Sequence, residues 1–327
     1  MILICFGTRP EWLKVKPLVA KLNCKLLFTG QHTDLLKDVP FDFKLTLSSE
    51  NYKERLNFVI GECLREFPNT EEFSHVLVQG DTATSFGCAL AAFNQGTKVI
   101  HLEAGLRTRD LNNPFPEEGY RQMISRISSI NLCPTDLARY NLESEGINGS
   151  YVVGNTVLDN LLPYKDKCKY GNKVLVTLHR RENHGNMAEW FQEISNLASE
   201  YPLLEFVLPL HPNPEVIRHK DLLKNVNVIA PMEHESLLNL LSECLLCITD
   251  SGGIQEEASF LNKKCIVCRL VTERSEGLET GHIILCKSPD LLTQCFYNII
   301  NDYEIQSECP FGDGHSSQKI KELLNEF

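Results

Sequence analysis

The sequence has no excess of positive charge. Its 327 residues include 32 Lys and Arg against 43 Asp and Glu, which gives a formal net charge of −11 at pH 7. Non-specific nucleic-acid binding requires a basic face, so this composition argues against a nucleic-acid partner. It is still compatible with a nucleotide ligand, because a diphosphate needs only a local cluster of cationic side chains and backbone N–H groups.

Long apolar runs are also absent. No segment of the sequence approaches the ~20 consecutive apolar residues that a membrane span requires. The apolar start over residues 1–6 is interrupted by the polar residues 7–11, which is too early for a secretory signal peptide. We therefore expect no membrane partner and a cytoplasmic location.

Cysteine, by contrast, is plentiful. The thirteen cysteines are an odd number and mostly lie in apolar runs, which predicts reduced thiols in the core of an intracellular protein. Cys244 and Cys247, followed by Cys265 and Cys268, have the spacing of a zinc ribbon. Both pairs resemble strands, however, and residues three apart in a strand point to opposite faces. We therefore favour buried structural cysteines over a metal site.

Short apolar runs alternate with helical patterns along the whole chain. The runs are apolar throughout, which is typical of parallel strands covered by helices on both faces. The pattern restarts after the polar stretch 163–172, which we interpret as an interdomain linker. The predicted fold class is α/β, with two doubly wound Rossmann-like domains over residues 1–163 and 164–315 and a ligand cleft between them. A last helix over residues 316–327 could pack on either domain.

The first strand of the first half ends in a turn that suits an anion. The segment GTRPE at residues 7–11 combines a glycine turn with the start of a helix, and Arg9 and Lys14 lie close by in the sequence. Exposed N–H groups at a helix start favour negative charge. The alternative is a plain strand-to-helix turn with basic residues on the surface.

Three carboxylates follow at later turns of the same half. Asp81 in QGDT and Glu103 in HLEAGLRT each come directly after a predicted strand, and Glu117 begins a helix after PFP. Taken one at a time, these residues have simpler explanations: Asp81 could cap a helix, and Glu117 could form an ion pair with Arg121 four residues on. Three acidic groups at successive turns on the switch-point side of one sheet are better explained by general acid and base chemistry, because like charges held close raise one another's pKa.

Two histidine turns open the second half. His179 lies in the basic segment HRREN after the first strand, which suggests phosphate binding, with a solvated surface as the alternative. His211 in HPNP follows the next strand and suggests phosphate binding in the same way, more weakly. A histidine at that position could equally be a packed core residue.

The segment DSGGIQEE makes the strongest prediction in the second half. Ser251, Gly252 and Gly253 lie between an apolar strand and a helix start, where backbone N–H groups can cradle a diphosphate. Glu257 lies one turn into the helix, within reach of ribose hydroxyls. Arg274, after the next strand, could reach the same phosphates. Gly-Gly turns are common, so the prediction depends on the position of this one.

These motifs occur in a defined order along nearly the whole chain. They are GTRPE at 7–11, QGDT at 79–82, HLEAGLRT at 101–108, PFPEE at 114–118, GNT at 154–156, HRREN at 179–183, DSGGIQEEA at 250–258 and TER at 272–274. With this set the chain resembles the non-hydrolysing UDP-N-acetylglucosamine 2-epimerase family. The resemblance implies a two-domain GT-B architecture, a homodimer, a UDP-sugar as substrate, and no metal or redox cofactor.

The resemblance also implies a role for each matching position. The residues implied to hold the nucleotide are Arg9, His211, Ser251, Gly253 and Glu257, with His179 and Arg274 near the diphosphate and sugar. The residues implied to surround the hexose are Asp81, Glu103 and Glu117, with Lys14 and Arg121 close by. The family route is elimination of UDP to a 2-acetamidoglucal, followed by re-addition after reprotonation on the other face. Which carboxylate removes the proton stays open.

The chain departs from the family pattern in three places. It is compact around residues 33–51, and residues 31–34 lack the basic residue that often follows Gln-His, near a segment where many relatives bind an activating second UDP-GlcNAc. Ser275 replaces a usual proline.

The alternatives to this function are a hydrolysing epimerase, an epimerase of a modified UDP-hexosamine, a GT-B glycosyltransferase and an inert UDP-sugar binder. The loop around Glu103 favours the non-hydrolysing branch, and the retained acids argue against the transferase and the inert binder.

Overall fold

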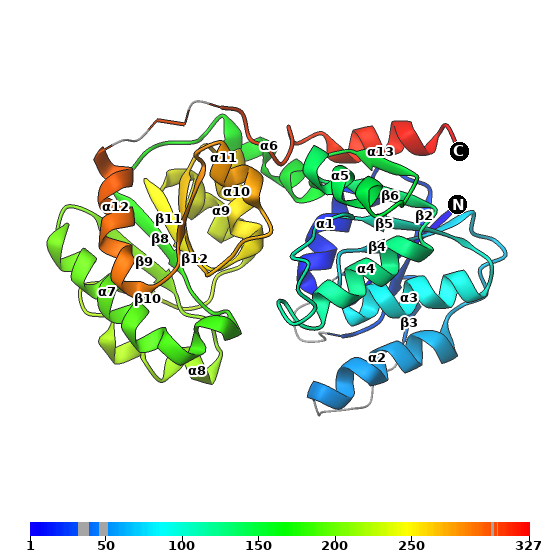
Figure 1. Cartoon of the computed structure of the whole chain (residues 1–327), viewed down its shortest axis with the longest axis horizontal. Coiled ribbons are helices and arrows are strands. Elements are labelled where there is room, and N and C mark those ends of the chain that lie inside the picture. Colours follow the sequence, from blue (N-terminus) through cyan, green and yellow to red (C-terminus); the bar gives the residue numbers. More distant parts are fainter. Residues whose placement is uncertain (32–38, 46–51, 302–303, 306) are drawn as a thin grey trace. The chain divides into compact units, whose positions relative to one another are not determined.

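A computed structural model describes residues 1–31, 39–45, 52–301, 304–305 and 307–327 of the chain. The chain forms two compact units (Figure 1). Unit 1 comprises Met1–Asn160 and Gly312–Phe327, and unit 2 comprises Leu161–Phe311. The departures noted at residues 32–34, and most of the compact region 33–51, lie outside the described residues.

Unit 1 is built on a parallel sheet with the strand order β3-β2-β1-β4-β5-β6-β7. Its strands are β1 (Ile2–Phe6), β2 (Cys24–Phe28), β3 (Phe43–Lys44), β4 (His75–Gln79), β5 (Lys98–Leu102), β6 (Ile130–Cys133) and β7 (Ser150–Val152). Its helices are α1 (Arg9–Val19), α2 (Tyr52–Glu66), α3 (Ala83–Asn94), α4 (Glu117–Ile127), α5 (Asp136–Ser144) and the C-terminal α13 (Ser316–Leu324). The short 3-10 helix η1 (Thr156–Leu161) leads out of the unit.

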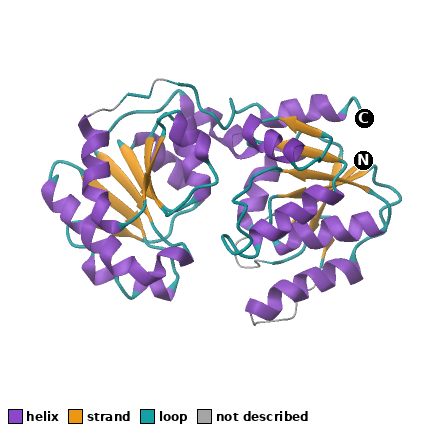
Figure 2. Cartoon of the chain, viewed as in Figure 1, coloured by secondary structure: helices purple, strands orange, loops and turns teal. Residues whose placement is uncertain are grey.

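Unit 2 repeats this architecture with the strand order β10-β9-β8-β11-β12-β13. Its strands are β8 (Lys173–Thr177), β9 (Glu205–Pro209), β10 (Asn227–Ile229), β11 (Leu246–Thr249), β12 (Lys264–Cys268) and β13 (Ile283–Cys286). Its helices are α6 (Leu162–Lys165), α7 (Met187–Glu200), α8 (Pro214–Ile217), α9 (His234–Glu243), α10 (Gly252–Phe260), α11 (Ser275–Glu279) and α12 (Leu292–Asn301). Helices cover both faces of each sheet (Figure 2), which confirms the predicted α/β class with two doubly wound parallel sheets.

The continuous apolar runs follow from this layering. Successive residues of β1 feed opposite cores: Leu3 and Cys5 pack under α2 and α3, whereas Ile4 and Phe6 pack under α1 and α13. Because both faces of the strand are covered, neither set of side chains needs to be polar.

Each sheet reverses its strand order at one place, and the motifs lie there. In unit 1 the order turns between β1 and β4, and in unit 2 it turns between β8 and β11. Connections leave such a switch point in opposite directions, so the loops after the two strands splay apart and leave a crevice for ligands. The segments GTRPE, QGDT, HRREN and DSGG contain the turns that follow these four strands.

The polar stretch 163–172, which we interpreted as an interdomain linker, belongs to the second compact unit. It begins unit 2, where Lys169 N donates to Ser242 O at 2.9 Å. The ammonium of Lys263, which is fully buried, donates to the carbonyl oxygens of Cys244 (2.8 Å) and Lys169. The backbone of this stretch therefore exchanges hydrogen bonds with unit 2, which composition does not reveal.

Candidate functional site

The turn after β1 is held by a buried carboxylate, Glu11. Thr8 caps α1, and Glu11 Oε2 accepts from Gly7 N (2.9 Å) and Thr8 N (2.7 Å) in a capping box. Its Oε1 accepts from Thr82 Oγ1 (2.6 Å) and Ser85 Oγ (3.0 Å) at the start of α3. Burial raises the pKa of Glu11 against the effect of these hydrogen bonds. One side chain thus joins the turns after β1 and β4.

Glu103 lies at the end of β5 in a left-handed backbone conformation, with φ 64°. Its Oε2 accepts from Lys14 Nζ at 2.5 Å and from Gln79 Nε2. The same oxygen lies 3.7 Å from where a Cβ on Gly80 would be, so Glu103 is next to the turn that carries Asp81. A non-glycine residue in this region is strained by roughly 1–3 kcal/mol, and such strain is characteristic of functional sites.

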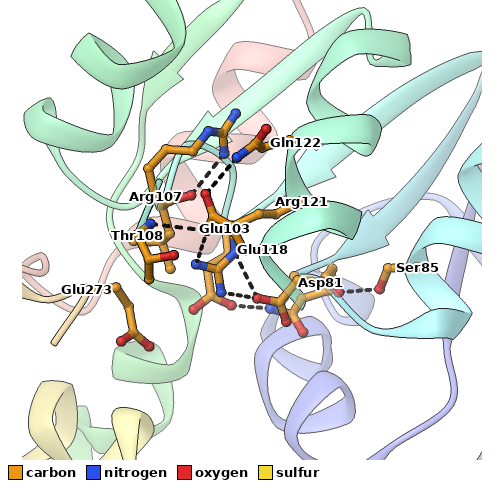
Figure 3. A network of polar contacts seen from close by, with 12 residues as sticks. Asp81, Ser85, Glu103, Arg107, Thr108, Glu118, Arg121, Gln122 and Glu273 are labelled. Carbon is orange, nitrogen blue, oxygen red and sulfur yellow. Dashed lines mark hydrogen bonds and ion pairs between the residues drawn. The ribbon is translucent and has the colours of Figure 1, made fainter. Parts of the chain in front are cut away.

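Asp81 and Arg121 form an ion pair that is extended by Glu118. Arg121 donates from Nε to Asp81 Oδ2 at 3.0 Å and from Nη1 to Glu118 Oε2 at 3.2 Å (Figure 3). Glu118 is fully buried and also accepts from Thr108 N (3.1 Å) and Arg109 N (3.2 Å). The Asp81 side chain keeps 27% exposure, so a ligand can reach it.

Unit 1 therefore brings several predicted residues to one edge of its sheet. Asp81, Glu103 and Lys14 come from the loops and helix next to β4, β5 and β1, and Arg121 comes from α4. Figure 3 shows the carboxylates of Asp81 and Glu103 near one another. The two other predicted residues of this unit are each the first residue of a helix, namely Arg9 of α1 and Glu117 of α4.

In unit 2 the HRREN and DSGG loops are joined by Asp250, which is fully buried. Its Oδ2 accepts from His179 N (2.9 Å), Arg180 N (2.8 Å) and Asn183 Nδ2 (3.1 Å). The ring of His179 stacks on the ring of His211, with centroids 4.8 Å apart and planes at 10°. Desolvation lowers the pKa of both imidazoles, which favours the neutral form at neutral pH. These two histidines can therefore donate to a ligand without adding full positive charge.

The DSGG turn packs so closely against Arg274 that the position of Gly252 requires a glycine. A Cβ on Gly252 would lie 2.7 Å from Arg274 Nη1, so a larger residue would displace the guanidinium. Arg274 is buried and its Nε donates to Glu256 Oε1 at 2.8 Å. Ser251 precedes α10, and Gly253 has open space where a Cβ would be. Backbone N–H groups at this helix start are suited to a phosphate.

Glu257 has a partner that the sequence did not suggest. Its Oε1 lies 2.8 Å from His234 Nε2, and the two side chains are 6% and 16% exposed. His234 is the first residue of α9, and Glu257 lies in the first turns of α10.

The cysteines are all free thiols, and the four at zinc-ribbon spacing are buried as predicted. Cys247 and Cys265 oppose one another on β11 and β12, whereas Cys268 faces the core under α7 and α12. Among the residues that the structure describes, no three His, Cys, Asp or Glu side chains form a group that could hold a metal ion. Within the same residues, no helix is long and apolar enough to cross a membrane.

Several residues of the site were missed in the sequence. Glu11 could have been found, because Thr8-Arg9-Pro10-Glu11 has the spacing of a capping box. Glu118 lies beside Glu117, and no local pattern says which of the two points inward. The partners supplied by Asp250, Glu256 and His234 depend on contacts between loops that are far apart in the sequence.

Comparison with known proteins finds similarity to one enzyme family over nearly the whole chain. A family model described as UDP-N-acetylglucosamine 2-epimerase matches residues 18–325. A Campylobacter jejuni UDP-N-acetylglucosamine 2-epimerase is 36% identical, with 99% of this chain and 97% of that protein covered. The UDP-GlcNAc 2-epimerase of Neisseria meningitidis, solved with UDP-GlcNAc, superposes with a TM-score of 0.89 at 34% identity and full coverage of both chains. A structure of S. aureus MnaA with UDP superposes with a TM-score of 0.88 at 32% sequence identity, and the match covers 100% of this chain and 97% of that chain.

Proposed function

The chain belongs to the UDP-N-acetylglucosamine 2-epimerase family, and we propose that it interconverts UDP-GlcNAc and UDP-ManNAc without net hydrolysis. The observation that carries the proposal is the grouping of Asp81 and Glu103 with Lys14 and Arg121 at one sheet edge of unit 1. An epimerisation at carbon 2 needs an acid and a base, and this edge supplies carboxylates held in place by cations.

The proposed route begins with departure of UDP from carbon 1 of the sugar. Cationic character develops there, so the proton on carbon 2 becomes acidic and a carboxylate can remove it. The products are UDP and a 2-acetamidoglucal. Reprotonation of carbon 2 on the opposite face and re-addition of UDP at carbon 1 complete the epimerisation, so atoms and charge balance without water. Asp81, Glu103 and Glu117 are the candidate acids and bases, with Lys14 and Arg121 beside them.

Unit 2 is proposed to hold UDP. The N–H groups at Ser251–Gly253, the stacked ring of His211 and the guanidinium of Arg274 would bind the diphosphate, with His179 and Arg9 contributing near it. Glu257 would accept from the ribose hydroxyls. Stabilisation of a departing anion requires donors that are already oriented, and Glu256 and Asp250 orient Arg274 and the His179 loop in this way. The cleft between the two domains and the homodimer stay predictions.

One experiment separates the proposal from its alternatives. The protein is incubated with UDP-GlcNAc in heavy water and followed by NMR. We expect deuterium at carbon 2 and a mixture that contains UDP-ManNAc with little free sugar. Free ManNAc with UDP would instead show a hydrolysing enzyme. Absence of deuterium uptake with UDP-GlcNAc and with modified UDP-hexosamines would contradict the proposal and leave a transferase or an inert binder.

A further inference from the structure

We infer that His234 is a positioning residue that orients Glu257 toward the ribose of the bound nucleotide, and so helps the site prefer ribonucleotides to deoxynucleotides. The inference rests on the proposed function, in which Glu257 accepts from the ribose hydroxyls. It starts from one contact inside unit 2, the 2.8 Å hydrogen bond between His234 Nε2 and Glu257 Oε1.

The direction of this hydrogen bond follows from its chemistry. A carboxylate can only accept, so His234 must donate through a hydrogen on Nε2. Because His234 engages Oε1, the second oxygen of Glu257 is left for a ligand. A carboxylate has about four lone-pair positions, so one donor from the protein and two from a ribose diol can be accommodated together.

Burial gives the contact its effect. The Glu257 side chain is only 6% exposed and that of His234 only 16%, so water does not readily replace either partner. A glutamate has several rotamers, and a bound conformation must otherwise be selected from them when the ligand arrives. His234 makes this selection before binding. Its own position is set because it begins α9, a helix whose Leu238 and Leu241 are buried.

Two variants isolate the hydrogen bond from the packing. His234→Phe keeps a ring of similar size and removes the donor. His234→Gln places an amide nitrogen where Nε2 lies and so keeps the donor. Affinities of the full-length wild type and both variants are measured by calorimetry for UDP and for 2′,3′-dideoxy-UDP.

We expect His234→Phe to weaken UDP binding about 3- to 10-fold, the range for the net contribution of one ordinary hydrogen bond. Binding of dideoxy-UDP should change less than about 2-fold, because this ligand has no ribose hydroxyls from which Glu257 could accept a hydrogen bond. His234→Gln should retain most of the affinity for UDP. In turnover, His234→Phe should raise KM for the UDP-sugar and leave kcat near the wild-type value. Equal losses for both ligands, or no loss for either, would overturn the inference.

Glu257→Gln separates failure of the inference from failure of the proposed function. If Glu257→Gln reduces the preference for UDP over dideoxy-UDP and His234→Phe does not, the role of His234 is wrong and the nucleotide site stands. If UDP does not bind the wild type, or if Glu257→Gln leaves the preference unchanged, the assignment of Glu257 fails and the inference fails with it.

Discussion

At the scale of single residues, the site of unit 1 depends on buried carboxylates with full sets of partners. Glu11 and Glu118 each accept four hydrogen bonds, and each joins two segments that carry predicted catalytic groups. A buried charge without partners is strongly unfavourable, so these residues bind their neighbours in one arrangement. We therefore expect these two residues to affect activity only indirectly, through the positions of Asp81 and Arg121.

Substitution of the three candidate acids should slow epimerisation and spare nucleotide binding. We expect Asp81→Asn, Glu103→Gln and Glu117→Gln each to lower the rate of carbon-2 deuterium exchange by roughly 10²- to 10⁴-fold, as is usual for a general acid or base. UDP affinity should stay close to wild type, since the proposed nucleotide residues named from unit 2 are untouched. The control is Glu72→Gln, which removes an exposed carboxylate paired with Lys25. Unchanged exchange in all three variants would refute the assignment.

Removal of Glu118 should cost much more stability than removal of an exposed acid. Glu118→Ala removes a hydrogen-bond acceptor from the buried guanidinium of Arg121 and from the N–H groups of Thr108 and Arg109. We expect a drop of about 3–5 kcal/mol in the free energy of unfolding by urea. Glu72→Gln should change it by less than about 1 kcal/mol. Equal effects of the two substitutions would show that the Glu118 network contributes little.

His101 should make stability depend on pH. It is fully buried, with Nε2 2.8 Å from Gly80 O, and burial lowers its pKa from 6.5 to about 4. The unfolded chain therefore binds a proton between pH 6.5 and 4 that the folded protein does not. Stability should be full above pH 6.5 and fall by about 3 kcal/mol as the pH drops to 4.

The variant His101→Gln is the control for this prediction. A glutamine amide can donate to Gly80 O in place of Nε2 and does not titrate. Unfolding free energies measured from pH 7 to 4 should therefore fall less steeply in the variant than in the wild type. Parallel curves would show that His101 is not the titrating group.

At the scale of elements, the site follows from strand order. Loops after β1 and β4 leave in opposite directions, and so do the loops after β8 and β11. The topology of each sheet thus places the catalytic candidates of unit 1 and the DSGG turn of unit 2, which is proposed to bind phosphate. The loop after β5 adds Glu103 and must then pass close to α5, which it can do only at a glycine.

Gly105 is the point of that close approach. Its φ is 88°, and a Cβ there would lie 2.1 Å from Ala138 O in α5. Gly105→Ala should lower the free energy of unfolding by roughly 1–3 kcal/mol more than its control, because backbone must move. The control is Gly96→Ala, where φ is 78° with nothing within 4 Å and only about 1–2 kcal/mol is expected. The comparison is made by urea denaturation, and similar losses would contradict the predicted clash.

At the scale of the whole molecule, the C-terminus completes unit 1. Asp159 accepts from Ser316 N (2.9 Å) and Ser317 N (2.8 Å) at the start of α13, and Ile320 is fully buried in the core under α1. The carboxylate satisfies N–H groups that a helix start leaves without intrahelical partners. The end of the chain therefore returns to the unit in which it began.

Ile320→Ala should destabilise unit 1 alone. The loss of a buried isoleucine is expected to lower the free energy of unfolding by about 2–5 kcal/mol. Binding of UDP, which is proposed for unit 2, should keep its affinity at 25 °C. The matched control is Leu291→Ala, which removes an aliphatic side chain that is 43% exposed in unit 2. A loss of UDP affinity with Ile320→Ala would contradict the assignment of most UDP contacts to unit 2.

The layered α/β architecture could be predicted from local sequence patterns, and so could the turns that carry most of the candidate site residues. Apolar runs covered on both faces are a local property, so strands could be recognised without knowing their neighbours. The motifs marked the turns with Asp81, Glu103 and Ser251–Gly253, because glycines and charged residues at strand ends are also local.

The contacts between distant side chains could not be predicted in this way and became known from the three-dimensional fold. Glu118 rather than its neighbour is buried, Asp250 joins two loops 70 residues apart, and His234 reaches Glu257. Lys263 likewise donates a hydrogen bond to the carbonyl oxygen of Lys169, within the polar stretch 163–172. Contacts of this kind depend on strand order and helix packing, and these are set by the free energy of the whole fold, which no window of neighbouring residues contains.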